Sequence, residues 1–195
     1  MSSRHLSITG TGLVCCLGSG VEPVYQAMCA GANGIHPIDR FPAAEYPQAH
    51  GGQVPEAVEE ALREAFPDDD FAAALVKTAG REAMRQARRD PGTNDPDLGL
   101  VLATNFGPME SLEWCWRERL DMGTLDEETF ARFDEFLESM GAWFGAGGPR
   151  AQISLSCASG ASALALAGDM IRGGRARRVL AIGYDVLSEF CWCGL

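Results

Sequence analysis

The chain has 195 residues, of which 46% are hydrophobic and 22% charged, as in an ordinary globular protein with one sizeable core. Its formal net charge of −11 argues against binding to nucleic acid or to an anionic membrane surface, because both need a basic face. No apolar run approaches the roughly 20 residues that span a bilayer, and the N-terminus lacks the apolar stretch of a signal peptide. We therefore expect a cytoplasmic protein.

The first predicted strand covers residues 6–14, where β-branched residues surround Gly10 and Gly12. A loop at 17–20 and a short helix over 21–31 follow, and residues 32–52, rich in proline and glycine, are predicted to be loop. The remaining elements are predicted as helices at 55–66, 71–89, 108–121, 126–144 and 158–172, and as strands at 98–104, 150–156 and 178–183. Strands that alternate with helices predict a layered α/β fold with a mostly parallel sheet, and we assign residues 1–195 to one domain.

The last six residues, 190–195, include a Phe, a Trp and a Leu. Natural termini are usually polar and exposed, so an apolar end directly after a predicted buried strand suggests that the sequence stops inside a fold. The alternative is a tail that packs into the chain's own core. We expect the former.

The seven cysteines are irregularly spaced and include no CxxC pair, so we predict reduced thiols with neither a zinc site nor a cofactor. Cys157 differs from the others because a predicted strand ends directly before it and a predicted helix starts directly after it. Such a sharp turn presents a nucleophile, and the partial positive charge of a helix N-terminus stabilises a thiolate and a developing oxyanion. The residues that follow, 158–163, are all small and would leave room for a substrate. The alternative is a buried cysteine in an alanine-rich packing helix.

The segment SLSCASGASALALAGDMIRGGRARRVLAIGYD around Cys157 resembles the active-site region of β-ketoacyl synthases. That family places its nucleophilic cysteine in a Thr/Ser-Ala/Ser-Cys-Ala-Ser/Thr-Gly context. Segments 8–41 and 97–111 resemble the family's opening strand, short helix and second strand, and Gly148-Pro149 matches the pair before its third strand. Because four motifs lie in register, Cys157 becomes the candidate catalytic nucleophile.

The resemblance implies a thiolase-like fold of two similar α/β halves, of which this chain would be an incomplete N-terminal half. It implies an acyltransferase of fatty-acid or polyketide biosynthesis, which moves an acyl group from acyl carrier protein to Cys157. Decarboxylative Claisen condensation with malonyl-carrier protein would follow. The family's two catalytic histidines and its lysine come from the second half, so His5, His36, His50 and Lys77 match none of them. We therefore expect that the isolated chain is not a competent condensing enzyme.

The expected partners are acyl carrier protein and a second copy or second condensing subunit, in a homodimer or heterodimer. A carrier protein is acidic, and the best basic candidate for its docking is the group Arg172, Arg175, Arg177 and Arg178. A solvated helix end, whose arginines suit the helix dipole, is the favoured explanation of these residues. We expect the aromatic residues Trp114, Trp116, Trp143 and Phe144 to form core or dimer contacts. A second functional interpretation is a non-catalytic partner, similar to a chain-length factor or to one part of a split protein. Acyl chain length and pathway remain undetermined by the sequence.

Overall fold

The computed structural model describes residues 5–122 and 133–194, which form two compact units. The first unit consists of Met1–Thr11, Gly80–Gly107 and Arg132–Asp185, and the second of Gly12–Ala79, Pro108–Ala131 and Val186–Leu195. The assignment of residues 1–195 to one domain stays a prediction. Each unit has its own buried residues.

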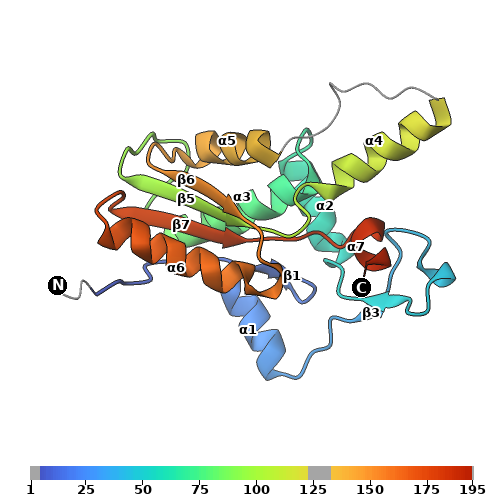
Figure 1. Cartoon of the computed structure of the whole chain (residues 1–195). Coiled ribbons are helices and arrows are strands. Elements are labelled where there is room, and N and C mark those ends of the chain that lie inside the picture. Colours follow the sequence, from blue (N-terminus) through green and yellow to red (C-terminus); the bar gives the residue numbers. More distant parts are fainter. Residues whose placement is uncertain (1–4, 123–132, 195) are drawn as a thin grey trace. The chain divides into compact units, whose positions relative to one another are not determined.

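A parallel sheet with the order β6-β5-β7 forms the centre of the first unit (Figure 1). The strands are β5 Leu98–Ala103, β6 Arg150–Ile153 and β7 Arg178–Gly183. Every residue of β5 is buried, as expected for a strand with a neighbour on both sides. The predicted parallel α/β arrangement is therefore confirmed in this unit.

The two faces of this sheet are covered by different helices. Helix α6, Ser159–Arg172, packs Ala163 and Met170 against Val101 and Ala103 of β5. Helix α5, Phe133–Phe144, lies on the opposite side of the sheet in Figure 1. Strand side chains alternate between the faces, so a continuously apolar strand such as β5 supplies a core to both helices.

Close approach of α3, Phe71–Gln86, to the other elements of the first unit depends on Gly80. A Cβ added there would lie 2.3 Å from Phe144 Cζ and 3.1 Å from Ile182 Cδ1. Phe144 itself is completely buried. Glycine at this helical position is therefore a packing requirement, because any side chain would displace the aromatic ring.

The predicted first strand at residues 6–14 is wrong. Residues 5–13 belong to no strand, and Ile8 is 81% exposed. Only Val14–Cys15, β1, is a strand, and it pairs with β2, Gly18–Ser19, in a small antiparallel hairpin, so part of the predicted loop at 17–20 is a strand too. A β-branched composition favours extended backbone, but a strand also needs a ladder partner, and residues 5–13 join no ladder in the structure.

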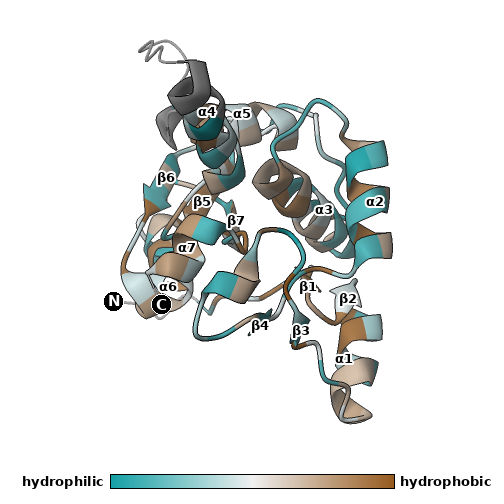
Figure 2. Ribbon diagram, turned by 90° about the vertical axis from the view of Figure 1, so that its right-hand side faces the viewer, coloured by the Kyte–Doolittle hydropathy of each residue, from teal (hydrophilic) through white to brown (hydrophobic). Residues whose placement is uncertain are grey.

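The second unit is mainly helical. It contains α1 Val21–Cys29, α2 Glu56–Ala65, the first part of α3, α4 Met109–Met122 and α7 Glu189–Cys193. The predicted loop at 32–52 also holds a 3-10 turn, Ala43–Glu45, and a two-stranded ladder of β3, His36–Pro37, and β4, His50–Gly51. Figure 2 shows α2 banded between hydrophilic and hydrophobic residues, as expected for a helix with one face in water.

Sequence signals placed the helix boundaries of this unit well. Helix α2 follows Pro55, and Asp70 Oδ1 accepts a hydrogen bond of 2.7 Å from Ala72 N at the start of α3. The predicted helix at 71–89 ends at Gln86, because Arg88 adopts a left-handed conformation with φ of 57°. Residues 126–132 of the predicted helix 126–144 lie outside the described residues.

The C-terminal segment was not predicted to be helical. Helix α7 follows Ser188, whose hydroxyl accepts a hydrogen bond from Cys191 N, and Cys191 is buried. Trp192 packs on Phe41 and donates from Nε1 to Gln48 O over 2.9 Å. Cys191 and Trp192 are therefore used inside the second unit, whereas Phe190 is 59% exposed.

The aromatic residues divide in a way that the sequence did not predict. Phe144 is buried and Trp143 meets it in an edge-on contact, as expected for core residues. Trp114 is 61% exposed and Trp116 is 44% exposed, so neither is a core residue, and the predicted alternative of a dimer contact stays a prediction. Helical periodicity alone does not say which side of α4 is covered.

Candidate active site

Cys157 lies on a tight turn between β6 and α6. Strand β6 ends at Ile153, three residues earlier than predicted, and Ser156–Ala158 form a 3-10 turn before α6 begins at Ser159. The Cys157 side chain is exposed. The turn thus presents the thiol to solvent at the entrance of a helix, and the alternative of a buried packing cysteine is wrong.

The residue directly before the cysteine has an unusual backbone conformation. Ser156 has a φ of 51°, in the left-handed region that residues with a Cβ rarely adopt. Such a conformation costs about 1–3 kcal/mol and persists only where neighbouring contacts enforce it. It is the kind of sharp turn that lifts a nucleophile above a sheet.

Ser159 supplies the contacts that hold this turn. Its side chain is buried, and its Oγ accepts a hydrogen bond of 2.8 Å from Leu155 N. The same hydroxyl lies 2.8 Å from Ser156 O and 3.3 Å from Asn105 Oδ1, both acceptors for its one hydrogen. The backbone on both sides of Ser156 is therefore tied to a single side chain two residues after Cys157.

The small residues of α6 have two different uses. Ser159, Ala163 and Ala167 are buried and bring the helix close to the sheet. In the described part of the chain, no atom beyond the helix's own backbone and adjacent residues lies within 4 Å of the place a Cβ on Gly160 would take. The start of α6 is therefore open at Gly160, and room for a substrate beside the sulfur stays a prediction.

A polar cluster lies where β5 and β7 end, and the sequence reasoning missed it. Asp185 Oδ1 accepts hydrogen bonds from Thr104 Oγ1 at 2.6 Å, Asn105 N at 2.9 Å and Phe106 N at 3.1 Å. Asn105 Nδ2 lies 3.4 Å from Asp185 Oδ2, and Thr104 Oγ1 also accepts from Gly107 N at 2.8 Å. Polar residues directly after two parallel strands were the available signal, because such strands end at the same edge of a sheet.

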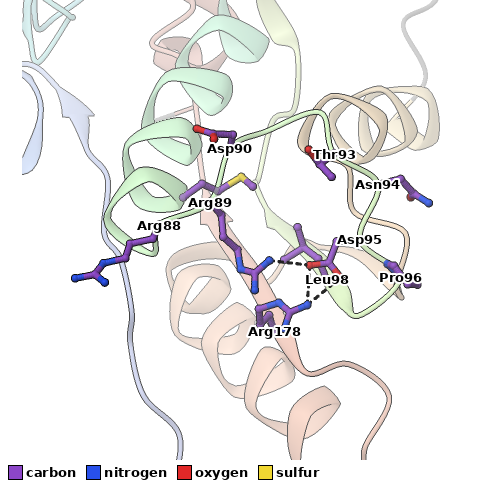
Figure 3. A pocket seen from close by; sticks show the side chains of 10 residues that line it. Arg88, Arg89, Asp90, Thr93, Asn94, Asp95, Pro96, Leu98 and Arg178 are labelled. Atoms are coloured by element: carbon purple, nitrogen blue, oxygen red, sulfur yellow. Dashed lines mark hydrogen bonds and ion pairs between the residues drawn. The ribbon is translucent and has the colours of Figure 1, made fainter.

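A second group of charges lies at the opposite, N-terminal ends of β5 and β7 (Figure 3). Arg178 Nη2 donates to both oxygens of Asp95, at 2.9 and 2.7 Å, and Arg89 Nη1 lies 3.3 Å from Asp95 Oδ2. The hydrogen bonds from Arg178 hold the pKa of Asp95 below its ordinary value, despite its partial burial, with help from Asp97 N and Arg89. These residues line a cavity of 370 Å³, from which Arg88 extends away in Figure 3.

This arrangement changes the interpretation of the predicted basic group. Arg178 belongs to strand β7 and not to the helix end, and its charge is compensated by Asp95. Arg177 lies 3.9 Å from Asp97, and Arg172 lies 3.5 Å from Asp169. The geometry therefore favours the solvated helix end with local ion pairs over a free basic patch.

An apolar cavity in the second unit has a volume of about 580 Å³. It lies between α4 and α7 and is lined by Met109, Leu112, Trp116 and Phe190, with Tyr46 and Cys193. Tyr46 donates to Glu189 Oε1 over 2.9 Å, and Cys193 Sγ lies 3.1 Å from the same hydroxyl. Cys157 belongs to the other unit and does not line this cavity.

The other thiols and the histidines show no catalytic grouping among residues 5–122 and 133–194. Within these residues, no group of three or more His, Cys, Asp or Glu side chains could hold a metal ion. Burial raises the pKa of the Cys16 thiol, and adjacent Cys15 raises it further, whereas Cys29 is exposed. His5, His36 and His50 are all exposed, as the sequence predicted. In the same described ranges, no helix is long and apolar enough to cross a membrane.

Comparison with known proteins agrees with this geometry. Residues 3–193 match the family model "Beta-ketoacyl synthase, N-terminal domain". The chain is 28% identical to the actinorhodin polyketide putative beta-ketoacyl synthase 2 of Streptomyces coelicolor, over 86% of this chain and 43% of that protein. It is also 28% identical to 3-oxoacyl-[acyl-carrier-protein] synthase 2 of Coxiella burnetii, over 96% of this chain and 47% of that protein.

Solved structures show the same fold. The ishigamide ketosynthase/chain length factor matches with a TM-score of 0.77 at 20% identity, over 96% of this chain and 55% of that one. The AntDE:AntF complex, a type II PKS acyl-carrier protein with its ketosynthase, matches with a TM-score of 0.74 at 22% identity, over 96% of this chain and 47% of that one.

The fold class is therefore thiolase-like, as predicted. The chain spans about half the length of the curated relatives that it matches. The match to the family model covers nearly every residue of the chain, including Cys157 and its turn. The protein belongs to the β-ketoacyl synthase family, of which it represents the N-terminal domain.

Proposed function

We propose that Cys157 is the acyl-accepting nucleophile of a β-ketoacyl synthase, and that this chain contributes the N-terminal half of the enzyme. The observation that carries the proposal is an exposed thiol on a left-handed turn at the start of α6, in a chain of this family. The partial positive charge at the start of α6 favours both the thiolate and a developing oxyanion.

In the proposed first step, the Cys157 thiolate attacks the carbonyl carbon of an acyl thioester. A bond forms between Sγ and that carbon, and the bond from the carbon to the donor's sulfur breaks. The donor leaves as a thiolate and takes up a proton, and the acyl group remains on Cys157. Acyl carrier protein is the proposed donor, since the AntDE:AntF structure pairs a ketosynthase with such a carrier.

In the proposed second step, a malonyl thioester loses CO₂ and its carbon attacks the acyl group on Cys157. The exposed histidines of this chain offer no matching pair for that decarboxylation, and the family's histidines and lysine lie in the second half. The proposal therefore assigns acyl transfer to this chain and condensation to the complete enzyme. Fatty-acid and polyketide pathways, pairing with a second condensing subunit and a cytoplasmic location remain predictions.

The test is covalent labelling. The chain is incubated with a labelled acyl-carrier-protein thioester, and the adduct is mapped by mass spectrometry of peptides. We expect one acyl group on Cys157, lost in Cys157→Ala and kept in Cys29→Ala, which removes an exposed thiol of the second unit. Condensation with malonyl-carrier protein should be absent until a second half is supplied.

The labelling experiment also decides the alternative. Two of the compared proteins are a chain-length-factor complex and a second synthase of a polyketide system. A non-catalytic partner would leave Cys157 unacylated although it reacts with iodoacetamide. That result would refute the nucleophile role and favour a binding partner.

A further inference from the structure

We propose that Asp185 is a positioning residue for Cys157 that acts through Asn105 and Ser159. The proposal rests on the nucleophile role proposed above. It goes beyond that role because Asp185 belongs to a different segment, 28 positions further along the chain than the cysteine. Three elements meet in this network: the ends of β5 and β7 and the start of α6.

The first link is the orientation of the Asn105 amide. Its Nδ2 lies 3.4 Å from Asp185 Oδ2, and its Oδ1 lies 3.3 Å from Ser159 Oγ. A carboxylate accepts hydrogen bonds and donates none, so the amide nitrogen must face Asp185. The amide oxygen then has to face Ser159. The charge of Asp185 thus decides which group Asn105 offers to the nucleophile turn.

The second link is the Ser159 hydroxyl. It accepts from Leu155 N at 2.8 Å, and its one hydrogen lies between Ser156 O at 2.8 Å and Asn105 Oδ1. The Asn105 amide oxygen attracts the hydrogen of the Ser159 hydroxyl. The lone pair of that hydroxyl therefore remains directed at Leu155 N. Ser159 can therefore hold the left-handed backbone of Ser156, whose next residue is Cys157.

The third link is the loop after β5. Asp185 Oδ1 takes the backbone N–H groups of Asn105 and Phe106 as well as the Thr104 hydroxyl. Hydrogen bonds to a charged group are about twice as strong as neutral ones, so the loop is fixed relative to β7. A misplacement of about 1 Å at a reacting group can lower a rate by about 100-fold. Fixing the loop that carries Asn105 should therefore help to keep the Cys157 sulfur in its reactive position.

The test compares acylation of Cys157 in four variants of the full chain. Asp185→Asn keeps the size of the side chain and removes its charge, and Ser159→Ala removes one oxygen. Ser159→Thr restores the hydroxyl. Asp169→Asn is the matched control, because it makes the same chemical change on the exposed side of α6.

We expect the maximal acylation rate to fall about 10-fold in Asp185→Asn and at least as much in Ser159→Ala, while the half-saturating thioester concentration stays within about twofold. Ser159→Thr should recover the rate to within about threefold, and Asp169→Asn should match the unsubstituted chain. If a variant simply lost its structure, the hydroxyl of Ser159→Thr would not restore the rate. The maximal acylation rate would also not fall alone, without a change in the half-saturating thioester concentration.

Folding is followed in the same samples. Buried Cys191 should resist iodoacetamide in every variant, and circular dichroism should show that each variant is folded at the temperature of the assay. If Asp185→Asn loosens the fold, the acylation rates of Ser159→Ala and Ser159→Thr decide whether the network positions Cys157. Unchanged rates in Asp185→Asn and Ser159→Ala, with normal acylation of the unsubstituted chain, would overturn the positioning role alone. Absence of acylation in the unsubstituted chain would instead overturn the proposed function, and the positioning role with it.

Discussion

The ion pair between Asp95 and Arg178 should stabilise the first unit, and its contribution can be worked out from its geometry. Arg178 is the first residue of β7, and Asp95 lies in the loop before β5. Asp95 N also donates to Gly145 O over 2.8 Å, so the loop is tied to the end of α5 as well. Breaking the pair should loosen the N-terminal edge of the sheet.

The expected coupling free energy between Asp95 and Arg178 lies between the values known for two kinds of interaction. A hydrogen bond to a charged group contributes about 1.5–3 kcal/mol, and an exposed ion pair about 0.2–1 kcal/mol. The Asp95 side chain is 17% exposed and that of Arg178 is 33% exposed, so solvent screens part of the attraction. We expect a coupling free energy of about 1–1.5 kcal/mol, which corresponds to a shift in the unfolding midpoint of about 2–6 °C for a chain of this size.

A double-mutant cycle in urea measures this coupling. Its members are Asp95→Asn, Arg178→Met and the double variant, and Arg175→Met serves as a control that removes a neighbouring exposed arginine. The coupling should decrease with added salt, because salt screens the attraction between partly exposed charges.

The stability that the Asp95–Arg178 pair contributes should depend on pH in one direction. Folding lowers the pKa of Asp95 below its ordinary value of 3.8, so the pair contributes its full stability above that value. The contribution is lost as the pH falls through the lower pKa of the folded state. A coupling below about 0.5 kcal/mol at pH 7, or one that persists unchanged in strong acid, would refute the reasoning.

Two further predictions concern backbone and packing. Gly80→Ala should destabilise the chain by about 1–3 kcal/mol, measured by urea unfolding, because its Cβ would lie 2.3 Å from Phe144 Cζ. Phe144→Leu in the same chain should recover part of that loss, and full additivity would argue against the clash. Arg88→Gly should stabilise by about 0.5–1 kcal/mol, since φ at this position is 57°, whereas Arg88→Val should destabilise. Equal stability of the glycine and valine variants would contradict the assigned conformation.

Much of the fold could be predicted because its signals are local. Leu98–Ala103 is a continuous apolar run and is a fully buried strand, and Pro55 and Asp70 mark helix starts that the structure confirms. The turn at Cys157 was also visible, because a strand pattern gives way to a run of small residues. The predicted strand at 6–14 was wrong for a non-local reason, since a strand forms only where its backbone pairs with another segment, and residues 5–13 belong to no strand.

The sequence by itself determined the family, the parallel α/β order and the position of the candidate nucleophile, because each depends on residues that are close together in the chain. Only the tertiary structure decided that the thiol is exposed, that Ser159 holds its turn, and that Thr104, Asn105 and Asp185 form one hydrogen-bonded cluster. It also showed that Arg178 pairs with Asp95, 83 positions away. Hydrogen bonds between distant segments depend on how strands are ordered and aligned, and a pattern read along the chain carries no information about that register.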